Sequence, residues 1–263
     1  MMLATVGQTT TAPGAGTTIT ISGTPNTKGA WIQLTAATPF DAHELFVKPG
    51  TSYLGTTATS LFDIGVGAAG AEQVIIPNVL WVQDQWCGFA SGGGLKFPVS
   101  IPKGSRIAAR AQGGAGAVSP TLTLTFINCG GDKPKSGKVF DIGTNLAASS
   151  ATALALATAA KSAWVQLTAA TAQRMDGFFL CLGNNGASVT TSQWARLDIG
   201  VGAAGAEQVV LADYVAGVDS NSELFLPVYS PLFPIKIPKG QRIAARGQGS
   251  VADNIYVQLL GIG

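Results

Sequence analysis

The sequence predicts an all-β protein built of two tandem antiparallel β-sandwich domains of jelly-roll type, related by an internal duplication. The twelve residues Asp63–Val74 return unchanged as Asp198–Val209. Polar and apolar residues alternate in most recognisable segments, which is the pattern of half-buried strands. Signals for helices are nearly absent. Short strands at this spacing, without helices between them, are typical of sandwich folds.

The duplication extends well beyond the twelve-residue block. Trp31–Thr38 recurs with one change as Trp164–Thr171, an offset of 133 residues, and Ile101–Arg110 recurs with one change as Ile237–Arg246, an offset of 136. A period of this length is that of a whole domain and is too long for a solenoid repeat. We therefore expect a first domain over residues 1–130, a Gly-, Pro- and Lys-containing linker over 131–138, and a second domain over 139–263.

The elements can be assigned in chain order. Residues 1–18, rich in Thr, Gly and Ala, are expected to form a flexible arm that could order against a neighbour. Alternation predicts strands over Thr18–Ile21, Trp31–Leu34, Thr121–Ile127 and Tyr256–Leu259. The Ala-rich segment 146–163 favours a helix by propensity, but Thr152–Leu156 aligns with the alternating residues of the first repeat, so we expect a strand there.

Two hairpins are predicted in the second repeat. Arg196–Val201 and Gln208–Leu211 would pair through the turn between them. Phe233–Ile237 and Arg242–Arg246 would pair through Pro238-Lys-Gly240, because proline presets φ and glycine permits a left-handed residue. In the latter strand Ile243 and Ala245 would be buried, with Arg242, Ala244 and Arg246 on the outer face.

Composition limits the classes of function. Charged residues are 11% of the chain, against about 25% in an average soluble domain, which suggests that a partner covers much of the surface. The net charge of +2 is scattered, so a nucleic-acid surface is not expected. Neither a membrane-spanning stretch nor a signal peptide is predicted. Cys87, Cys129 and Cys181 are expected to be unpaired, as in a protein made in the cytoplasm.

Each copy of the block contains the dinucleotide-binding pattern G-x-G-x-x-G, over Gly65–Gly70 and Gly200–Gly205. That function requires a helix to begin at the pattern, because the amino-terminal N–H groups of the helix hold the pyrophosphate. Here β-branched residues follow instead. We therefore interpret the glycines as a turn or bulge and expect no cofactor.

Catalytic and metal-binding constellations are weak. Asp63 and Glu72, repeated as Asp198 and Glu207, could form an acid and base pair, but the alternative that Asp63 caps a turn or pairs with an arginine such as Arg110 is favoured. His43 is interpreted as a surface histidine, with its counterpart near Met175 or Asp176. No spacing of Cys, His or Asp fits a metal site. We predict no catalytic, cofactor-binding or metal-binding residues.

The candidate interface residues are four arginines and two tryptophans. Arg106, Arg110, Arg242 and Arg246 lie on the outer faces of their predicted strands, where they could anchor a partner or could pair with Asp63 and Asp198. Trp81 and Trp86 have no tryptophan in the other repeat, so a role in binding sugars stays open for them. With Trp194, Tyr53 and Tyr214 they could form a stacking platform.

The pattern Asp-Ile-Gly-Val-Gly-Ala-Ala-Gly-x-Glu, followed by Ile-Pro-x-Gly-x-Arg-Ile-Ala-Ala-Arg, resembles uncharacterised proteins from the structural modules of tailed bacteriophages and prophages. The resemblance covers the core of each repeat. It implies a non-enzymatic virion component that binds the major capsid protein or other virion proteins: a capsid decoration or cement protein, or a head spike. The alternative is a tail-associated protein that binds a receptor or glycan. A homo-oligomer is expected, and a trimer would present six similar modules.

Overall fold

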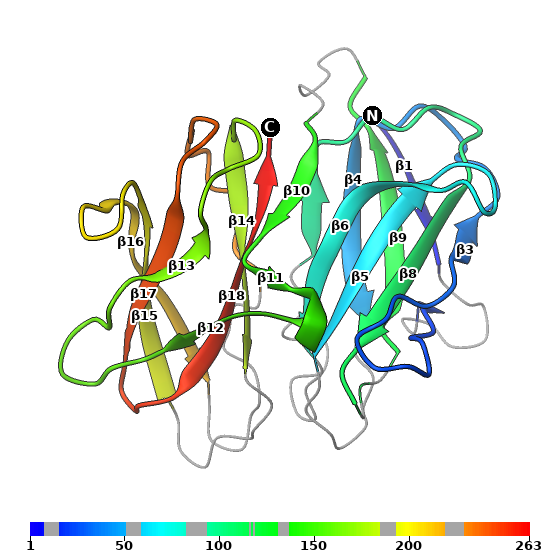
Figure 1. Ribbon diagram of the computed structural model, residues 1–263. Helices are drawn as coiled ribbons and strands as arrows, with labels where there is room; N and C mark the ends of the chain where they lie inside the picture. The colour runs from blue at the N-terminus through cyan, green and yellow to red at the C-terminus, as the bar shows by residue number, and fades with distance from the viewer. Residues whose placement is uncertain are drawn as a thin grey trace.

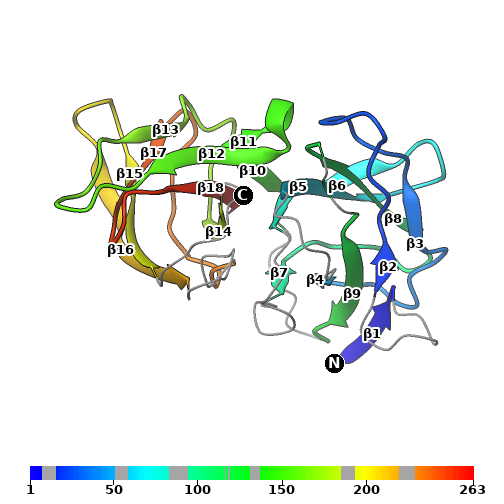
Figure 2. The same ribbon diagram turned by 90° about the horizontal axis from the view of Figure 1, so that it is seen from below.

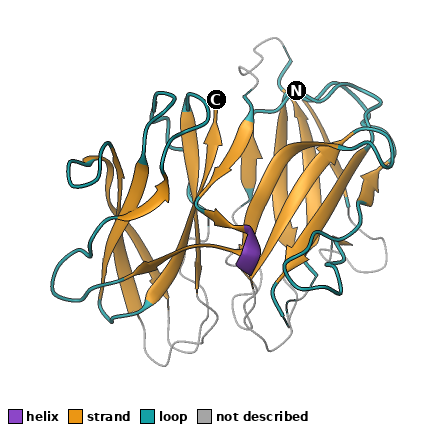
Figure 3. Cartoon of the chain, in the orientation of Figure 1, coloured by secondary structure: helices purple, strands orange, loops and turns teal. Residues whose placement is uncertain are grey.

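The computed structural model describes residues 1–7, 16–50, 59–82, 94–115, 117, 119–130, 137–184, 193–218 and 229–263. These residues form four antiparallel sheets and a single turn of 3-10 helix, η2 (Leu146–Ala148). Figure 3 shows how completely strands dominate the described chain. The predicted all-β sandwich class is therefore confirmed.

The first half of the chain contributes two sheets. The β9 sheet has the order β1 (Met2–Val6), β9 (Thr121–Asn128), β4 (Glu44–Gly50), β7 (Leu95–Phe97), with β2 (Thr17–Thr18) also paired to β9. The β8 sheet has the order β3 (Ile32–Thr35), β8 (Ile107–Gly113), β5 (Thr59–Val66), β6 (Gln73–Val82). The two sheets face each other across a common core (Figure 2).

The second half repeats this arrangement. The β18 sheet has the order β10 (Val139–Ile142), β18 (Asn254–Ile262), β12 (Ser150–Ala155), β11 (Thr144–Asn145), with β14 (Gly177–Asn184) also paired to β18. The β17 sheet has the order β13 (Val165–Thr168), β17 (Ile243–Gly249), β15 (Gln193–Val201), β16 (Gln208–Val218). Strand β15 is therefore the counterpart of β5, and β16 is the counterpart of β6.

Most predicted strands are confirmed, including the Ala-rich one. Residues 150–155 form β12, which pairs with β18 from Thr152↔Val257 to Ala155↔Asn254. Leu154 is fully buried while its neighbours are more exposed. The alternation required for packing on a sheet thus overrides the helix propensity of alanine. The hairpin of β15 and β16 is also as predicted.

The second predicted hairpin is wrong. Phe233 forms a β-bridge with Phe178 of β14, and Ile237 forms one with Met175 just before β14. This segment therefore lies along the β18 sheet, whereas β17 belongs to the opposite sheet. The turn at Pro238–Gly240 exists, with Gly240 at φ +83°, but it carries the chain from one sheet to the other. Pro234 and Pro238 lack the N–H groups that a ladder with β17 would need.

Two further expectations need correction. The amino-terminal arm is partly a strand, because β1 pairs along its length with β9 and so satisfies one edge of that strand; residues 8–15 lie outside the described part. The outer face of the strand at Arg242–Arg246 is also less open than expected. Ala244 is fully buried like Ile243 and Ala245, because neighbouring side chains cover this face. Of the predicted linker, residues 131–136 lie outside the described part.

The two halves meet along strand β6. Figure 1 shows β10, β14 and β18 beside β6, between the two sandwiches. The first core includes Phe179, Leu260 and Ile262 of the second half, whose strand neighbours face the second core. The central strands of the β18 sheet are consequently buried on both faces. Phe97 and Phe179 meet edge to face across this junction, with ring centroids 5.2 Å apart.

Side chains of the second half close the open edge of β6. The backbone N–H of Leu80 donates to Gln258 Oε1 at 3.0 Å, and the Leu80 carbonyl accepts from the Tyr229 hydroxyl at 2.7 Å. Gln258 Nε2 donates in turn to the carbonyl of Asn78 at 2.6 Å and to Thr144 Oγ1 at 2.8 Å. Gln258 is fully buried. An edge strand that would otherwise expose unpaired backbone groups is thereby satisfied within the chain.

We expect Gln258→Ala to lower the free energy of unfolding by about 2–5 kcal/mol, because it leaves the Leu80 N–H and the Asn78 carbonyl buried without partners. Chemical denaturation measures this directly. The matched control is Gln208→Ala on exposed β16, for which the change should stay within about 0.5 kcal/mol. Equal stability of the two variants would contradict the described junction.

Candidate functional site

Two of the side chains that the sequence singled out for chemistry, Asp63 and Arg110, lie together on the outer face of the β8 sheet. Asp63 of β5 lies opposite Arg110 of β8, and Arg110 Nε donates to Asp63 Oδ2 at 2.9 Å. Lys28 Nζ donates to Asp63 Oδ1 at 2.9 Å, and the N–H of Asn78 donates to the same oxygen at 2.8 Å. The Trp31 ring covers Arg110, whose guanidinium carbon lies 4.6 Å from the ring centroid. We call this arrangement the Asp–Arg–Trp motif.

The same motif is present in the second half. Arg246 Nε donates to Asp198 Oδ2 at 2.9 Å, and the N–H of Asp213 donates to Asp198 Oδ1 at 2.9 Å. Lys161 forms an ion pair with Asp198. The Trp164 ring centroid lies 4.5 Å from the guanidinium carbon of Arg246. Asp63 and Asp198 are both buried, so each carboxylate is withdrawn from solvent and held by two cations.

A second ion pair flanks each motif. Arg106 Nη1 donates to Glu72 Oε1 at 2.7 Å, and Arg242 Nη1 donates to Glu207 Oε1 at 2.6 Å. Arg106 also donates from Nε to Gln33 Oε1 at 2.8 Å. These contacts fix the hairpin turn before β6, or before β16, to the start of β8 or β17. All four arginines proposed as interface residues therefore have partners within the chain.

Electrostatics follow from this pairing. Burial opposes ionisation of the Asp198 carboxyl, but hydrogen bonds from Lys161, the Asp213 N–H and Arg246 outweigh it, so the pKa of Asp198 lies below its ordinary value. The pKa values of Glu72 and Glu207 are also lowered. Burial again acts in the opposite direction, and backbone N–H groups with the facing arginine outweigh it.

The pKa values of the two lysines of the motif are shifted in opposite directions. Burial lowers the pKa of Lys28, and the attraction of Asp63 does not compensate for it. Lys161 also loses solvent, but its pKa is raised because it hydrogen-bonds to Asp198 and to Asp213. The second half has a carboxylate at 213, 2.8 Å from Lys161 Nζ, where the first half has Asn78. This added carboxylate joins Asp198 in raising the pKa of Lys161, whereas Lys28 has Asp63 alone as its hydrogen-bonded carboxylate.

The contacts support a structural interpretation of the aspartates. The prediction that Asp63 pairs with Arg110 is confirmed, and Asp198 does the same with Arg246. A general acid must hold a proton at working pH and reach a substrate. A buried carboxylate with a lowered pKa, as at Asp198, holds no proton near neutral pH.

The glycine pattern builds the same motif. Strand β16 follows Gly200–Gly205 where a nucleotide-binding loop would need a helix, so the prediction of a turn is confirmed. Gly70 and Gly205 adopt φ of +81° and +80° in the turns. A Cβ on Gly200 would lie 2.7 Å from Trp164 Cη2. Glycine at this position therefore lets the tryptophan lie flat over the sheet and reach Arg246.

His43 is not a surface residue as predicted. It is buried, its backbone N–H donates to the Ile127 carbonyl at 2.8 Å, and its Nδ1 accepts the Cys129 N–H at 3.3 Å. The reason is that Ala42 forms a β-bridge with Ile101, which holds the neighbouring His43 against the end of β9. Cys129 and Cys181 are free, and burial raises the pKa of both thiols. Cys87 lies outside the described residues.

The tryptophans separate into three kinds. Trp31 and Trp164 cover arginines, as described above. Trp81 is buried in the first core, so it is not a surface residue of this chain, while Trp86 and Tyr53 lie outside the described residues. Trp194 is 43% exposed and lies beside Arg196, 5.5 Å from ring centroid to guanidinium carbon. The predicted platform is not assembled by the described aromatic residues.

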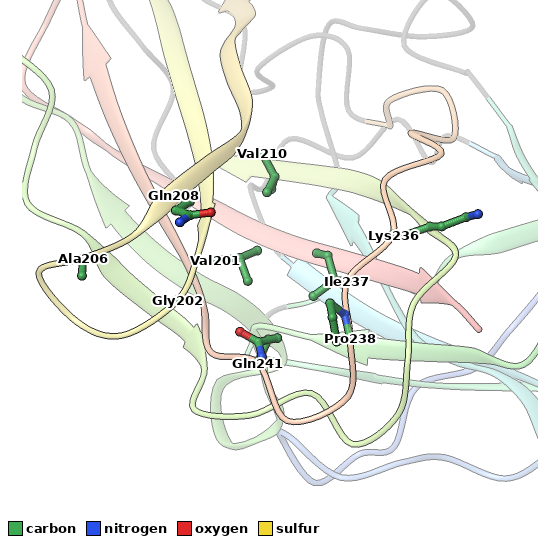
Figure 4. A pocket seen from close by; sticks show the side chains of 9 residues that line it. All are labelled: Val201, Gly202, Ala206, Gln208, Val210, Lys236, Ile237, Pro238 and Gln241. Atoms are coloured by element: carbon green, nitrogen blue, oxygen red, sulfur yellow. The ribbon is translucent and has the colours of Figure 1, made fainter.

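A shallow cavity of about 370 Å³ lies between the turn after β15 and the segment before β17 (Figure 4). It is lined by Val201, Gly202, Ala206, Gln208, Val210, Lys236, Ile237, Pro238 and Gln241. Lys236 is the one ionisable residue among them, and Figure 4 shows its amine pointing away from the other lining side chains. The lining offers no acid and base pair.

The described residues lack two other kinds of site. They contain no cluster of three or more His, Cys, Asp or Glu side chains placed to hold a metal ion. No helix among them has the length and apolar character needed to cross a membrane.

Comparison with known proteins gives weak similarities only. No family model and no curated protein matches the chain. Among solved structures, PNGF-II in two crystal forms aligns with 98% of this chain and 65% of its own, at 9% identity and TM-scores of 0.40 and 0.37. The structure of infectious bursal disease virus Gx strain aligns with 86% of this chain and 58% of its own, at 14% identity and a TM-score of 0.27.

We expect Asp198→Asn to lower the free energy of unfolding at pH 7 by about 1–3 kcal/mol, because the partly buried Lys161 and Arg246 lose their shared anion. Since the pKa of Asp198 is lowered by folding, its contribution is present at neutral pH and is lost as pH falls below about 5 through the folded pKa. Denaturation curves at several pH values should therefore show a smaller acid-side slope for the variant.

The control for this comparison is Asp253→Asn, whose carboxylate accepts the neighbouring Asn254 N–H. It should change the free energy of unfolding at pH 7 by less than about 0.5 kcal/mol. An Asp198→Asn protein with wild-type stability and an unchanged acid-side slope would show that the motif does not stabilise the sheet.

Proposed function

We propose that the chain is a non-enzymatic structural component of a bacteriophage particle, a capsid decoration or cement protein or a head spike that binds the major capsid protein. The duplication of the whole Asp–Arg–Trp motif carries this proposal. The residues most alike between the halves are those that hold strands together, and their charges neutralise each other inside the chain. The duplication therefore preserves the contacts that give each half its shape, as expected of a structural component.

Three further observations support the proposal. The repeated motifs resemble those of phage structural modules. The chain is poor in charge, and its ion pairs use several of those charges internally, which leaves a surface of small and polar residues suited to contact with neighbouring subunits. The ionisable candidates for catalysis are either paired, as Asp63 and Asp198 are, or buried, as His43 is.

The alternative, a tail-associated protein that binds a receptor or glycan, is favoured by one observation. Trp194 exposes part of its ring beside Arg196, and an exposed aromatic ring can stack on a sugar. It is the one large aromatic residue exposed among the residues that the structure describes. One exposed ring is weaker support for the tail alternative than the repeated motif is for a module that binds the capsid lattice.

Quantitative mass spectrometry of particles from a bacterial host that carries the gene tests the proposal. A decoration or cement protein should occur at a copy number comparable with that of the major capsid protein. A far lower copy number, with binding of the purified protein to host cells that Trp194→Ala abolishes, would favour the tail alternative. Complete absence from purified particles would contradict both.

A further inference from the structure

The contact between the two halves is made by one surface from each. The first half contributes the outer face and open edge of β5 and β6, where Leu61 and Leu80 are buried. The second half contributes the outer face of β10, β14 and β18, where Val139, Phe179 and Ile262 are buried. We call these the edge surface and the face surface.

Because the halves are homologous, each also contains a counterpart of the surface that the other uses. The counterpart of the edge surface is fixed by the repeated motif. The N–H of Asn78 donates to Asp63 and that of Asp213 donates to Asp198, so two residues later Val215 corresponds to Leu80. Leu61 pairs with Leu80 in β5 and β6, and Arg196 pairs with Val215 in β15 and β16.

This second edge surface is open. Val215 is 60% exposed, whereas Leu80 is 0% exposed. Trp194, two residues before Arg196 on β15, is also exposed. Within the described residues, β16 pairs on one side with β15 and has no strand on its other side. The Leu80 N–H donates to Gln258. Because Arg196 pairs with Val215 as Leu61 pairs with Leu80, we expect the Val215 N–H to face the open side in the same way.

The counterpart of the face surface follows from strand register. Glu44 pairs with Ile127 as Gly177 pairs with Ile262, and Leu3 pairs with Ile127 as Val139 pairs with Ile262. Hence Leu3 corresponds to Val139 and Ile127 to Ile262. By the same register Phe46 corresponds to Phe179, and Thr123 corresponds to Gln258.

This second face surface is open as well. Leu3 is 56% exposed, whereas Val139 is 4% exposed. Phe46 and Ile127 are partly exposed. Figure 2 shows β16 and β1 on opposite sides of the molecule. No other described residue therefore covers an edge surface at one end of the chain or a face surface at the other, and the two are homologues of surfaces that bind each other in the junction.

We propose that copies of this chain associate head to tail, with the β16 edge of one copy docked on the β1, β9 and β4 face of the next. The occupant of each surface is a second copy because each exposed surface corresponds to one half of a contact that the chain already makes. The inference does not rest on the proposed function. Such a heterologous contact repeats the junction between chains and gives a closed ring or an open array.

The contact between copies should be weaker than the junction. Arg196 replaces Leu61 and adds a charge to the edge surface. Thr123 replaces Gln258, so the amide that bonds to the edge of β6 in the junction is missing from the second face surface. Association also costs translational and rotational freedom that the covalent link between the halves avoids. We therefore expect assembly that depends on protein concentration.

Sedimentation velocity of the full chain over a range of concentrations tests the inference. The wild type should assemble, and Val215→Asp and Leu3→Asp should each reduce assembly at a given concentration at least tenfold, since either charge would be desolvated in the contact. Val209→Asp is the matched control. It lies on the same strand, and Val209 and its counterpart Val74 are exposed to nearly the same extent, 43% and 42%, so the junction does not cover this position.

Mixing the two variants distinguishes head-to-tail contact from a two-fold dimer. Each variant keeps one intact surface, so an equimolar mixture of Val215→Asp and Leu3→Asp should form a one-to-one complex that does not grow further. Thermal unfolding of each variant alone should match the wild type, because both positions are exposed. A wild type that stays monomeric at every concentration, or assembly that survives either substitution, would overturn the proposal.

Discussion

The backbone of Leu80 connects the two halves of this protein into one body. A strand at the edge of a sheet has unpaired N–H and C=O groups, and a buried group of that kind must find a partner or destabilise the fold. Here the partners are two side chains of the second half, Gln258 and Tyr229. The apolar residues around them complete a core that draws on both halves. The relative placement of the two sandwiches follows from this contact.

Within each half the Asp–Arg–Trp motif organises the opposite face. Trp31 and Trp164 lie flat over an arginine because a glycine on the next strand leaves room for the ring. The arginine is fixed in turn by a buried aspartate on that strand. A buried ion pair of this kind contributes little net stability relative to an apolar alternative, but it is costly to break and it specifies strand register. Conservation of the motif in both repeats agrees with such a role.

Local patterns in the sequence predicted much of this. Alternation located β3, β9 and β18, and the repeat showed that the alanine-rich segment, β12, is a strand. Opposite charges on adjacent outer faces predicted the pair of Asp63 and Arg110. Where the sequence misled, the cause was non-local. Pro238 and Gly240 make the predicted turn, but the chain that follows enters the other sheet, and nothing within a few residues indicates that choice.

The junction could not be predicted from one sequence for the same reason. Gln258 alternates with apolar residues in β18 and so has the pattern of a solvent-facing residue, and Leu80 lies 178 residues away. Burial of His43 and Trp81 likewise depends on contacts with distant strands.

Hydrogen exchange at the Leu80 amide tests the central claim most directly, because this proton is protected only if the halves stay together. The account predicts that it exchanges as slowly as the most protected amides of β5 and β8, through global unfolding. Exchange by a much faster local opening, with those core amides still protected, would show that the two halves separate readily and would contradict the account.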